Sequence, residues 1–302
     1  MEREIIANAY HHVYWGVPIA VYYWMAGISE GIFMIASLGW AFGIKRFKSI
    51  SLYTTIIAVS LISAVQVLLV FDLGRVERAL HLFPIVTGYW HESAPLAWGS
   101  ILVFAYTIGA ILYGIFVYLK NEKLARFFGL LTFPLAGALC WYTGVALELN
   151  PSRHPNHTGM AALLFFVGAN LSGWGASCLL IWARDYFVKP ENRISPDVIL
   201  MLGQMLLIGI TFDLFLVFSE FLQMSYGTAH EYHTLSIIKT VFKGAVPFWY
   251  MGVGLVIPFI IFLTPFGRKR EGIVAASAFI VVGMFGMRVG WVLVGQFSQS
   301  FF

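Results

Sequence analysis

Long apolar runs alternate with short polar connections along the whole chain. Each run has about 20 residues or more, which is enough for an α-helix to cross the hydrocarbon core of a bilayer. None shows the period-two alternation that a membrane β-strand requires. The pattern therefore predicts eight transmembrane helices, over residues 17–43, 51–72, 96–119, 127–149, 159–183, 197–226, 244–266 and 272–296.

The composition is that of a membrane protein. Of the 302 residues, 59% are hydrophobic and only 11% are charged, whereas a soluble domain carries about 25% charged residues. Too few charges remain to cover a water-facing surface. No linker, low-complexity segment or internal repeat divides the chain. We therefore predict one all-α, polytopic membrane domain that covers residues 1–302.

Lysine and arginine residues are distributed unevenly between the two sides of the predicted bundle. The odd-numbered connections carry 12 of the 19, while the N-terminus and the even-numbered connections carry six, and Arg288 lies within the last span. Because basic residues collect in cytoplasmic connections, we predict that both termini are extracytoplasmic in a multi-pass protein of the cytoplasmic membrane. The net charge of +4 is explained by these clusters, so nucleic acid is not an expected partner.

Five ionisable residues lie within or at the outer ends of the predicted spans: Glu30, Asp72, Asp213, Glu220 and Arg288. A charge at such depth costs at least about 2.5–3.5 kcal/mol, so these groups should face one another or water. One arginine neutralises one carboxylate. The other acids must be protonated, hydrated or placed at a helix end, which favours proton transfer as their role. A structural ion pair of Arg288 with Asp213 or Glu220 is the simpler alternative.

The end of the fourth span, Trp141–Pro151, combines a phenol, a glycine and a carboxylate where lipid gives way to water. An aromatic belt with a terminal acid is common at this boundary and needs no further function. An acid at such depth also invites a functional interpretation. Tyr142 and Glu148 are six residues apart, about 120° around a helix, so they need not touch the same ligand atom. Gly144 would let a ring or a neighbouring helix approach closely.

The sequence offers no set of residues suited to a haem or an iron–sulfur cluster. All eight histidines lie in termini or connections, whereas a bis-histidine haem needs histidines inside helices. Cys140 and Cys178 form no Cys-x-x-Cys pair, so neither a cluster nor a metal is expected. Phosphate-binding and dinucleotide-binding patterns are also missing. Tyrosines and acids that converge on an outer cavity suit a quinone, which takes up two electrons and two protons.

Several segments, in order along the sequence, resemble signatures of the NrfD/PsrC-type family of membrane subunits. They are Trp15-Gly16-Val17-Pro18 through Tyr22-Tyr23-Trp24, Gly27-Ile28-Ser29-Glu30-Gly31, Asp72-Leu73-Gly74-Arg75, Ser93-Ala94-Pro95-Leu96-Ala97-Trp98-Gly99-Ser100, Tyr142-Thr143-Gly144, Asn170-Leu171-Ser172-Gly173 and Arg288 through Gly295-Gln296. Each segment alone is modest, whereas their order and depth together are specific. The resemblance covers nearly the whole chain.

This resemblance implies a haem-free anchor of eight helices in two packed four-helix bundles. Such an anchor exchanges electrons between menaquinone or ubiquinone in the membrane and a ferredoxin-like, four-cluster iron–sulfur subunit on the outer face. That subunit serves a molybdopterin catalytic subunit or a multihaem cytochrome. A tyrosine of the fourth helix belongs to the quinone site of the polysulfide reductase branch, and Tyr142 matches it. That branch also uses a histidine and an asparagine of the first helix, where Tyr22 and Pro18 stand in this chain.

The resemblance and the depth of each residue give the expected roles. Quinone binding is assigned to Tyr142, Tyr22, Tyr23 and Gly144. Proton relay is assigned to Asp72, Glu30, Glu148, Asp213 and Glu220, with Glu148 as a proton exit or a partner-facing group. Charge pairing is assigned to Arg75 and Arg288. A transporter that moves ions or protons with the same buried acids is the alternative, although no paired, broken helices in corresponding halves support it.

Overall fold

The computed structural model describes residues 15–72, 80, 88, 94–148, 159–227 and 229–297. Within these residues there is no strand, and eight helical segments are long and apolar enough to cross a membrane. They are α1 (Val17–Trp40), α2 (Lys45–Asp72), α4 (Pro95–Tyr118), α5 (Glu122–Glu148), α6 (Met160–Phe187), α7 (Pro196–Tyr226), a composite seventh span and α11 (Arg270–Phe297). The prediction of an all-α protein with eight spans is confirmed.

The ends of the helices follow local sequence. Pro18, Pro95 and Pro196 lie in the first turns of α1, α4 and α7, where the missing backbone N–H of proline has no helical partner to lose. Helices α2 and α5 begin earlier than predicted, at Lys45 and Glu122. Their first turns are polar, so the apolar run alone does not reveal them.

The seventh span is built from three consecutive pieces. Helix α9 (Ala245–Pro247) leads into the π-helical segment η3 (Phe248–Val256), and α10 (Ile257–Leu263) completes the span. The backbone hydrogen bonds of a π-helix run between residues i and i+5 rather than i and i+4, and such segments are frequent at functional sites. Shorter elements outside the spans are η2 (Pro190–Asn192), α8 (Ala229–Thr240) and η4 (Pro265–Arg268).

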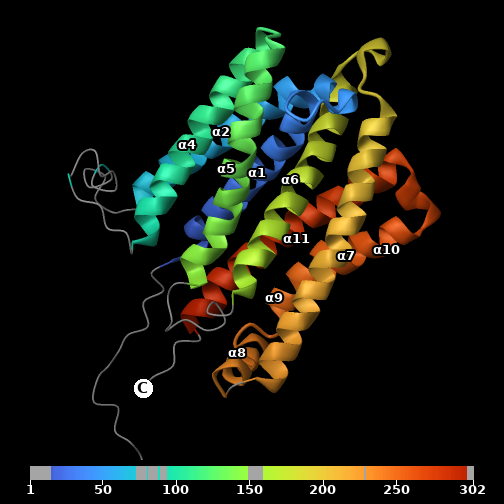
Figure 1. Cartoon of the computed structure of the whole chain (residues 1–302). Helices are drawn as coiled ribbons and strands as arrows, with labels where there is room; N and C mark the ends of the chain where they lie inside the picture. Colours follow the sequence, from blue (N-terminus) through green and yellow to red (C-terminus); the bar gives the residue numbers. More distant parts are fainter. Residues whose placement is uncertain are drawn as a thin grey trace, which may run out of the picture.

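The spans form two groups that meet along α1 and α6 (Figure 1). Helices α1, α2, α4 and α5 pack together, and α6, α7, α11 and the composite span form the other group. The most buried helices are α1 and α6. They approach closely because Gly31 and Gly173 face each other, and a Cβ atom on Gly31 would lie 2.9 Å from the Cα of Gly173. Small residues allow this kind of contact between membrane helices.

Alternating span directions bring particular helix ends together (Figure 1). The start of α1, the end of α5 and the start of α6 lie at one end of the bundle, and we call it the Val17 end. The residues of interest on α1 and α5 therefore share this end although they are far apart in sequence. That the Val17 end faces the outside stays a prediction.

Candidate functional site

Three tyrosines meet near the Val17 end, and we call them the tyrosine group: Tyr22, Tyr23 and Tyr142. Tyr22 and Tyr23 are buried on α1, and their rings make an edge-on contact with centroids 5.1 Å apart. Tyr142 comes from α5, is half-buried, and interacts electrostatically with Tyr22. Its phenol ring packs on Gly99 of α4, where a Cβ atom would overlap the ring. Residues assigned to one site from the sequence are therefore brought together.

The tyrosine group keeps hydrogen-bonding capacity for a ligand. Within the described residues, the hydroxyls of Tyr22 and Tyr142 make no hydrogen bond. Their surroundings are aromatic, since Tyr23 also makes an edge-on contact with the ring of Phe165, at 5.9 Å between centroids. A phenol in an apolar site donates readily to a carbonyl oxygen. This arrangement fits a flat ligand that carries hydrogen-bond acceptors.

A second set of polar residues is buried inside the helix bundle, and we call it the charge group: Glu30, Asp213, Tyr250 and Arg288. Arg288 is 1% exposed and interacts electrostatically with the other three. Its Nη2 atom donates to the backbone carbonyl of Phe165 at 2.9 Å, and its guanidinium lies 3.9 Å from the centroid of the Phe165 ring. A guanidinium suits such a site because it combines hydrogen bonding with contact to an aromatic face.

Glu30 is an electrostatic neighbour of both the tyrosine group and Arg288. Its side chain is fully buried, and among the described residues neither carboxyl oxygen accepts a hydrogen bond. Its electrostatic neighbours include the Arg288 guanidinium, the Cys140 thiol and the Tyr22 phenol. Arg288 makes no direct ion pair with any carboxylate of the described residues. The structure therefore does not show the predicted alternative, a direct ion pair of Arg288 with Asp213 or Glu220.

Asp213 has a partner that the sequence did not single out. The hydroxyl of Tyr250 lies 3.1 Å from each of its two carboxyl oxygens. Tyr250 belongs to η3, so the π-helical segment brings this phenol to α7. It also interacts electrostatically with Glu220, two turns along α7 from Asp213. Tyr250 therefore links the two acids. In the sequence it is a tyrosine within an apolar run, and nothing else there marks it as a functional residue.

Glu148 and Gly144 connect α5 to α6. Oε1 of Glu148 accepts a hydrogen bond from the backbone N–H of Ala162 at 2.6 Å, in the first turn of α6. A carboxylate there satisfies a free N–H group and complements the helix dipole. Beside Gly144, the space for a Cβ atom is taken by the backbone of Ala161 and Ala162. Gly144 was expected to let a ring or a neighbouring helix approach closely, and the structure shows that the neighbour is helix α6.

Two predicted residues cannot be placed in the same detail. Asp72 is the last residue of α2, and Arg75 lies outside the described residues. The residues that the structure describes contain no group of three or more His, Cys, Asp or Glu side chains that could hold a metal ion. Cys140 and Cys178 are free, buried thiols.

Comparison with known proteins gives consistent matches. Residues 6–298 match the family described as Polysulphide reductase, NrfD. A subunit of the polysulfide reductase of Wolinella succinogenes is 28% identical over an alignment of 320 positions, gaps included, which covers 95% of this chain and 96% of that protein. The Hdr-like menaquinol oxidoreductase integral membrane subunit of Archaeoglobus fulgidus is 24% identical over 84% of this chain, which spans only 64% of that relative. A subunit of the selenate reductase of Mesobacillus selenatarsenatis is 23% identical, over 93% of this chain and 73% of that protein.

Proposed function

The chain belongs to the NrfD polysulphide reductase family, and we propose that it is a quinone-reactive membrane anchor of a respiratory oxidoreductase. In this role it passes electrons between membrane quinone and an extracytoplasmic iron–sulfur subunit, which serves a molybdopterin enzyme or a multihaem cytochrome. The names of its relatives, subunits of polysulfide and selenate reductases and of a menaquinol oxidoreductase, support this. The observation that carries the proposal is the convergence of the tyrosine group beside Glu30.

The tyrosine group would hold the quinone. A bound quinone supplies reversible uptake of two electrons and two protons. The hydroxyls of Tyr142 and Tyr22 would donate hydrogen bonds to its carbonyl oxygens, and the edge of Tyr23 would pack beside the ring. Aromatic walls exclude water, which strengthens these hydrogen bonds. The close contact of Tyr142 with Gly99 fixes the position of the phenol from the α4 side.

The charge group would exchange protons with this site. Glu30 interacts electrostatically with Tyr22 on one side and with Arg288 on the other. It would take up or release a proton, while the guanidinium of Arg288 compensates the carboxylate that results. Asp213, Tyr250 and Glu220 extend this set of groups along α7 and would continue the relay. Asp72 and Glu148 remain candidates for its exit at the Val17 end.

The test is the substitution Tyr142→Phe in the assembled complex. Loss of one preorganised hydrogen-bond donor is expected to lower quinone-linked turnover about 100-fold. Activity of the partner with an artificial dye should be unchanged, because the dye bypasses the membrane site. Tyr118→Phe is the matched control, since Tyr118 is exposed at the far end of α4. Unchanged quinone-linked turnover in Tyr142→Phe would contradict the site.

A second candidate function is translocation of protons or ions by the same acids. The buried Glu30, Arg288 and Asp213 favour it, because they connect α1, α11 and α7 deep inside the bundle. The protein alone, reconstituted in liposomes under a pH gradient, separates the two functions. Flux without a redox partner supports the transporter, whereas a tight bilayer and quinone-linked turnover only in the complex support the anchor.

A further inference from the structure

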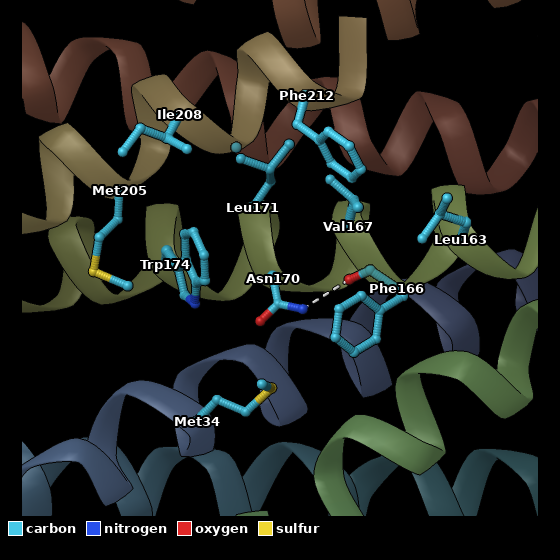
Figure 2. Close-up of a pocket in the computed structure, with 11 residues that line it drawn as sticks. Met34, Leu163, Phe166, Val167, Asn170, Leu171, Trp174, Met205, Ile208 and Phe212 are labelled. Carbon is cyan, nitrogen blue, oxygen red and sulfur yellow. Dashed lines mark hydrogen bonds between the residues drawn. The ribbon is translucent and has the colours of Figure 1, made fainter. Parts of the chain in front are cut away.

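A groove lies between α6 and α7, and its lining residues are different from those of both polar groups described above. Its volume is about 410 Å³, within the range of about 300–1,000 Å³ that is typical of small-molecule sites. We call it the α6–α7 groove (Figure 2). Residues that define it are Val167, Asn170 and Trp174 of α6, Ile208 and Phe212 of α7, and Met34 of α1. None belongs to the tyrosine group or the charge group.

Two buried polar atoms beside this apolar groove have no hydrogen-bond partner among the described residues. Asn170 is 5% exposed, and its Nδ2 atom donates to the carbonyl of Phe166 at 2.8 Å. Its Oδ1 atom and the Nε1 atom of Trp174 have no hydrogen-bond partner among the described residues. Figure 2 shows that both atoms point from α6 toward α1, on the side of Met34. One is an acceptor and the other a donor, one helical turn apart.

The depth of this pair limits what can satisfy it. Asn170 lies ten residues from the start of the 28-residue helix α6, near the middle of a predicted span. Lipid tails have no hydrogen-bonding group, and an unpaired polar group in hydrocarbon is costly. A molecule that reaches this depth and carries a polar group would satisfy the pair. The exposed side chains of Ile208 and Phe212 put the α7 wall in contact with lipid, so such a molecule can enter sideways.

We propose that the α6–α7 groove is a binding site for quinol, separate from the tyrosine group and selective for the reduced form. One quinol hydroxyl can donate to Oδ1 of Asn170 and accept from Nε1 of Trp174 at the same time. A quinone carbonyl only accepts, so it satisfies Trp174 and leaves Asn170 unpaired. The inference rests on the proposed function in one respect, that the protein works with membrane quinone, but it involves different residues.

The shape of the groove agrees with this ligand. Phe212, Phe166 and Trp174 supply aromatic surface for a flat ring, and such surface is typical of small-molecule sites. The thioethers of Met34 and Met205 are flexible and fit irregular shapes such as an isoprenoid tail. A phospholipid acyl tail would fill the same volume, but it would leave the Asn170–Trp174 pair unpaired.

The test measures equilibrium binding to the full-length protein in quinone-free lipid nanodiscs. The probes are a decyl-substituted naphthoquinol, kept reduced without oxygen, and its oxidised form. We expect two quinol sites per protein molecule and a preference of about tenfold for quinol at the groove, the effect of one buried acceptor left unpaired. Asn170→Leu should remove this preference by weakening quinol binding alone. Trp174→Phe should weaken both forms, and the control Met205→Leu should weaken neither.

The outcomes separate this inference from the proposed function. A single quinol site that disappears in Tyr142→Phe, with no effect of Asn170→Leu, overturns the groove and leaves the tyrosine site standing. Two sites, of which Asn170→Leu weakens quinol binding at one while Tyr142→Phe leaves turnover unchanged, support the groove and contradict the tyrosine site. Equal affinity of quinol and quinone at the groove, or phospholipid as its sole occupant, also overturns the inference. If Asn170→Leu does not accumulate, Trp174→Phe decides, because its ring keeps the groove filled.

Discussion

The tyrosine group and the charge group are both drawn from several helices, yet they satisfy their polar atoms differently. Tyr22 and Glu30 are eight residues apart on α1, about 12 Å along a helix. In the tyrosine group, the hydroxyls of Tyr22 and Tyr142 make no hydrogen bond within the described residues. In the charge group, Tyr250 bonds Asp213 and Arg288 bonds the backbone, while both carboxyl oxygens of Glu30 and Nη1 of Arg288 have no hydrogen-bond partner among the described residues. Open hydroxyls favour ligand binding, whereas a guanidinium among buried acids favours keeping charge inside the bundle.

The largest effect should come from removing the charge that holds the second group together. Arg288→Leu leaves Glu30 and Asp213 buried without the guanidinium and also breaks its bond to Phe165. Breaking such a buried charged cluster costs about 3–5 kcal/mol. Thermal melting of the purified protein should show a large loss, and Glu30→Gln in the same protein should restore part of it.

A matched surface substitution makes this test specific. Arg268 is exposed in η4, so Arg268→Leu should change the stability by about 0.5 kcal/mol or less. Equal melting temperatures for Arg288→Leu and Arg268→Leu would show that the charge group does not depend on its arginine.

Two Tyr→Phe substitutions compare the groups directly. Tyr250→Phe removes the phenol that contacts both oxygens of Asp213 and should cost about 1–3 kcal/mol of stability, because a buried acceptor loses its donor. Tyr142→Phe removes a hydroxyl without such a bond in the described residues, so it should lower turnover and barely change melting. If Tyr142→Phe destabilises the protein as much as Tyr250→Phe, the tyrosine group cannot be distinguished from the charge group as a site kept open for a ligand.

A smaller effect tests how Tyr142 is positioned. Gly99→Ala places a methyl group where the phenol ring of Tyr142 lies. The ring must move, and a displaced donor should lower quinone-linked turnover about tenfold. Gly137→Ala on α5 is the control, because a Cβ atom there meets only the Phe166 ring at 3.7 Å. Turnover at saturating quinone measures both, and equal values would show that the contact with Gly99 does not position Tyr142.

The sequence predicted the positions of the helices and their polar residues better than it predicted the contacts between helices. Run lengths located all eight spans, and helical spacing with span direction brought Tyr142 to the same end as Tyr22. The partner of Asp213 was missed because Tyr250 reaches it through a π-helical segment that no local pattern revealed. The contact of Arg288 with a backbone carbonyl and the groove beside Asn170 both depend on how α6 packs. The hydropathy pattern indicates how far a residue lies from the ends of its span, but it does not indicate which helices pack against each other.

The smallest expected effect concerns Glu148, for which the sequence predicted a proton exit and the structure shows a bond to α6. Glu148→Gln keeps an acceptor for the N–H of Ala162 but removes the charge at the helix N-terminus, which should cost about 0.3–1 kcal/mol. Glu271→Gln, an exposed acid in the first turn of α11, is the matched control. If Glu148 only joins the helices, melting should fall slightly and quinone-linked turnover should stay constant. If it also releases protons, turnover should fall in addition to the slight loss of melting temperature, because the amide holds the helix but cannot carry the proton.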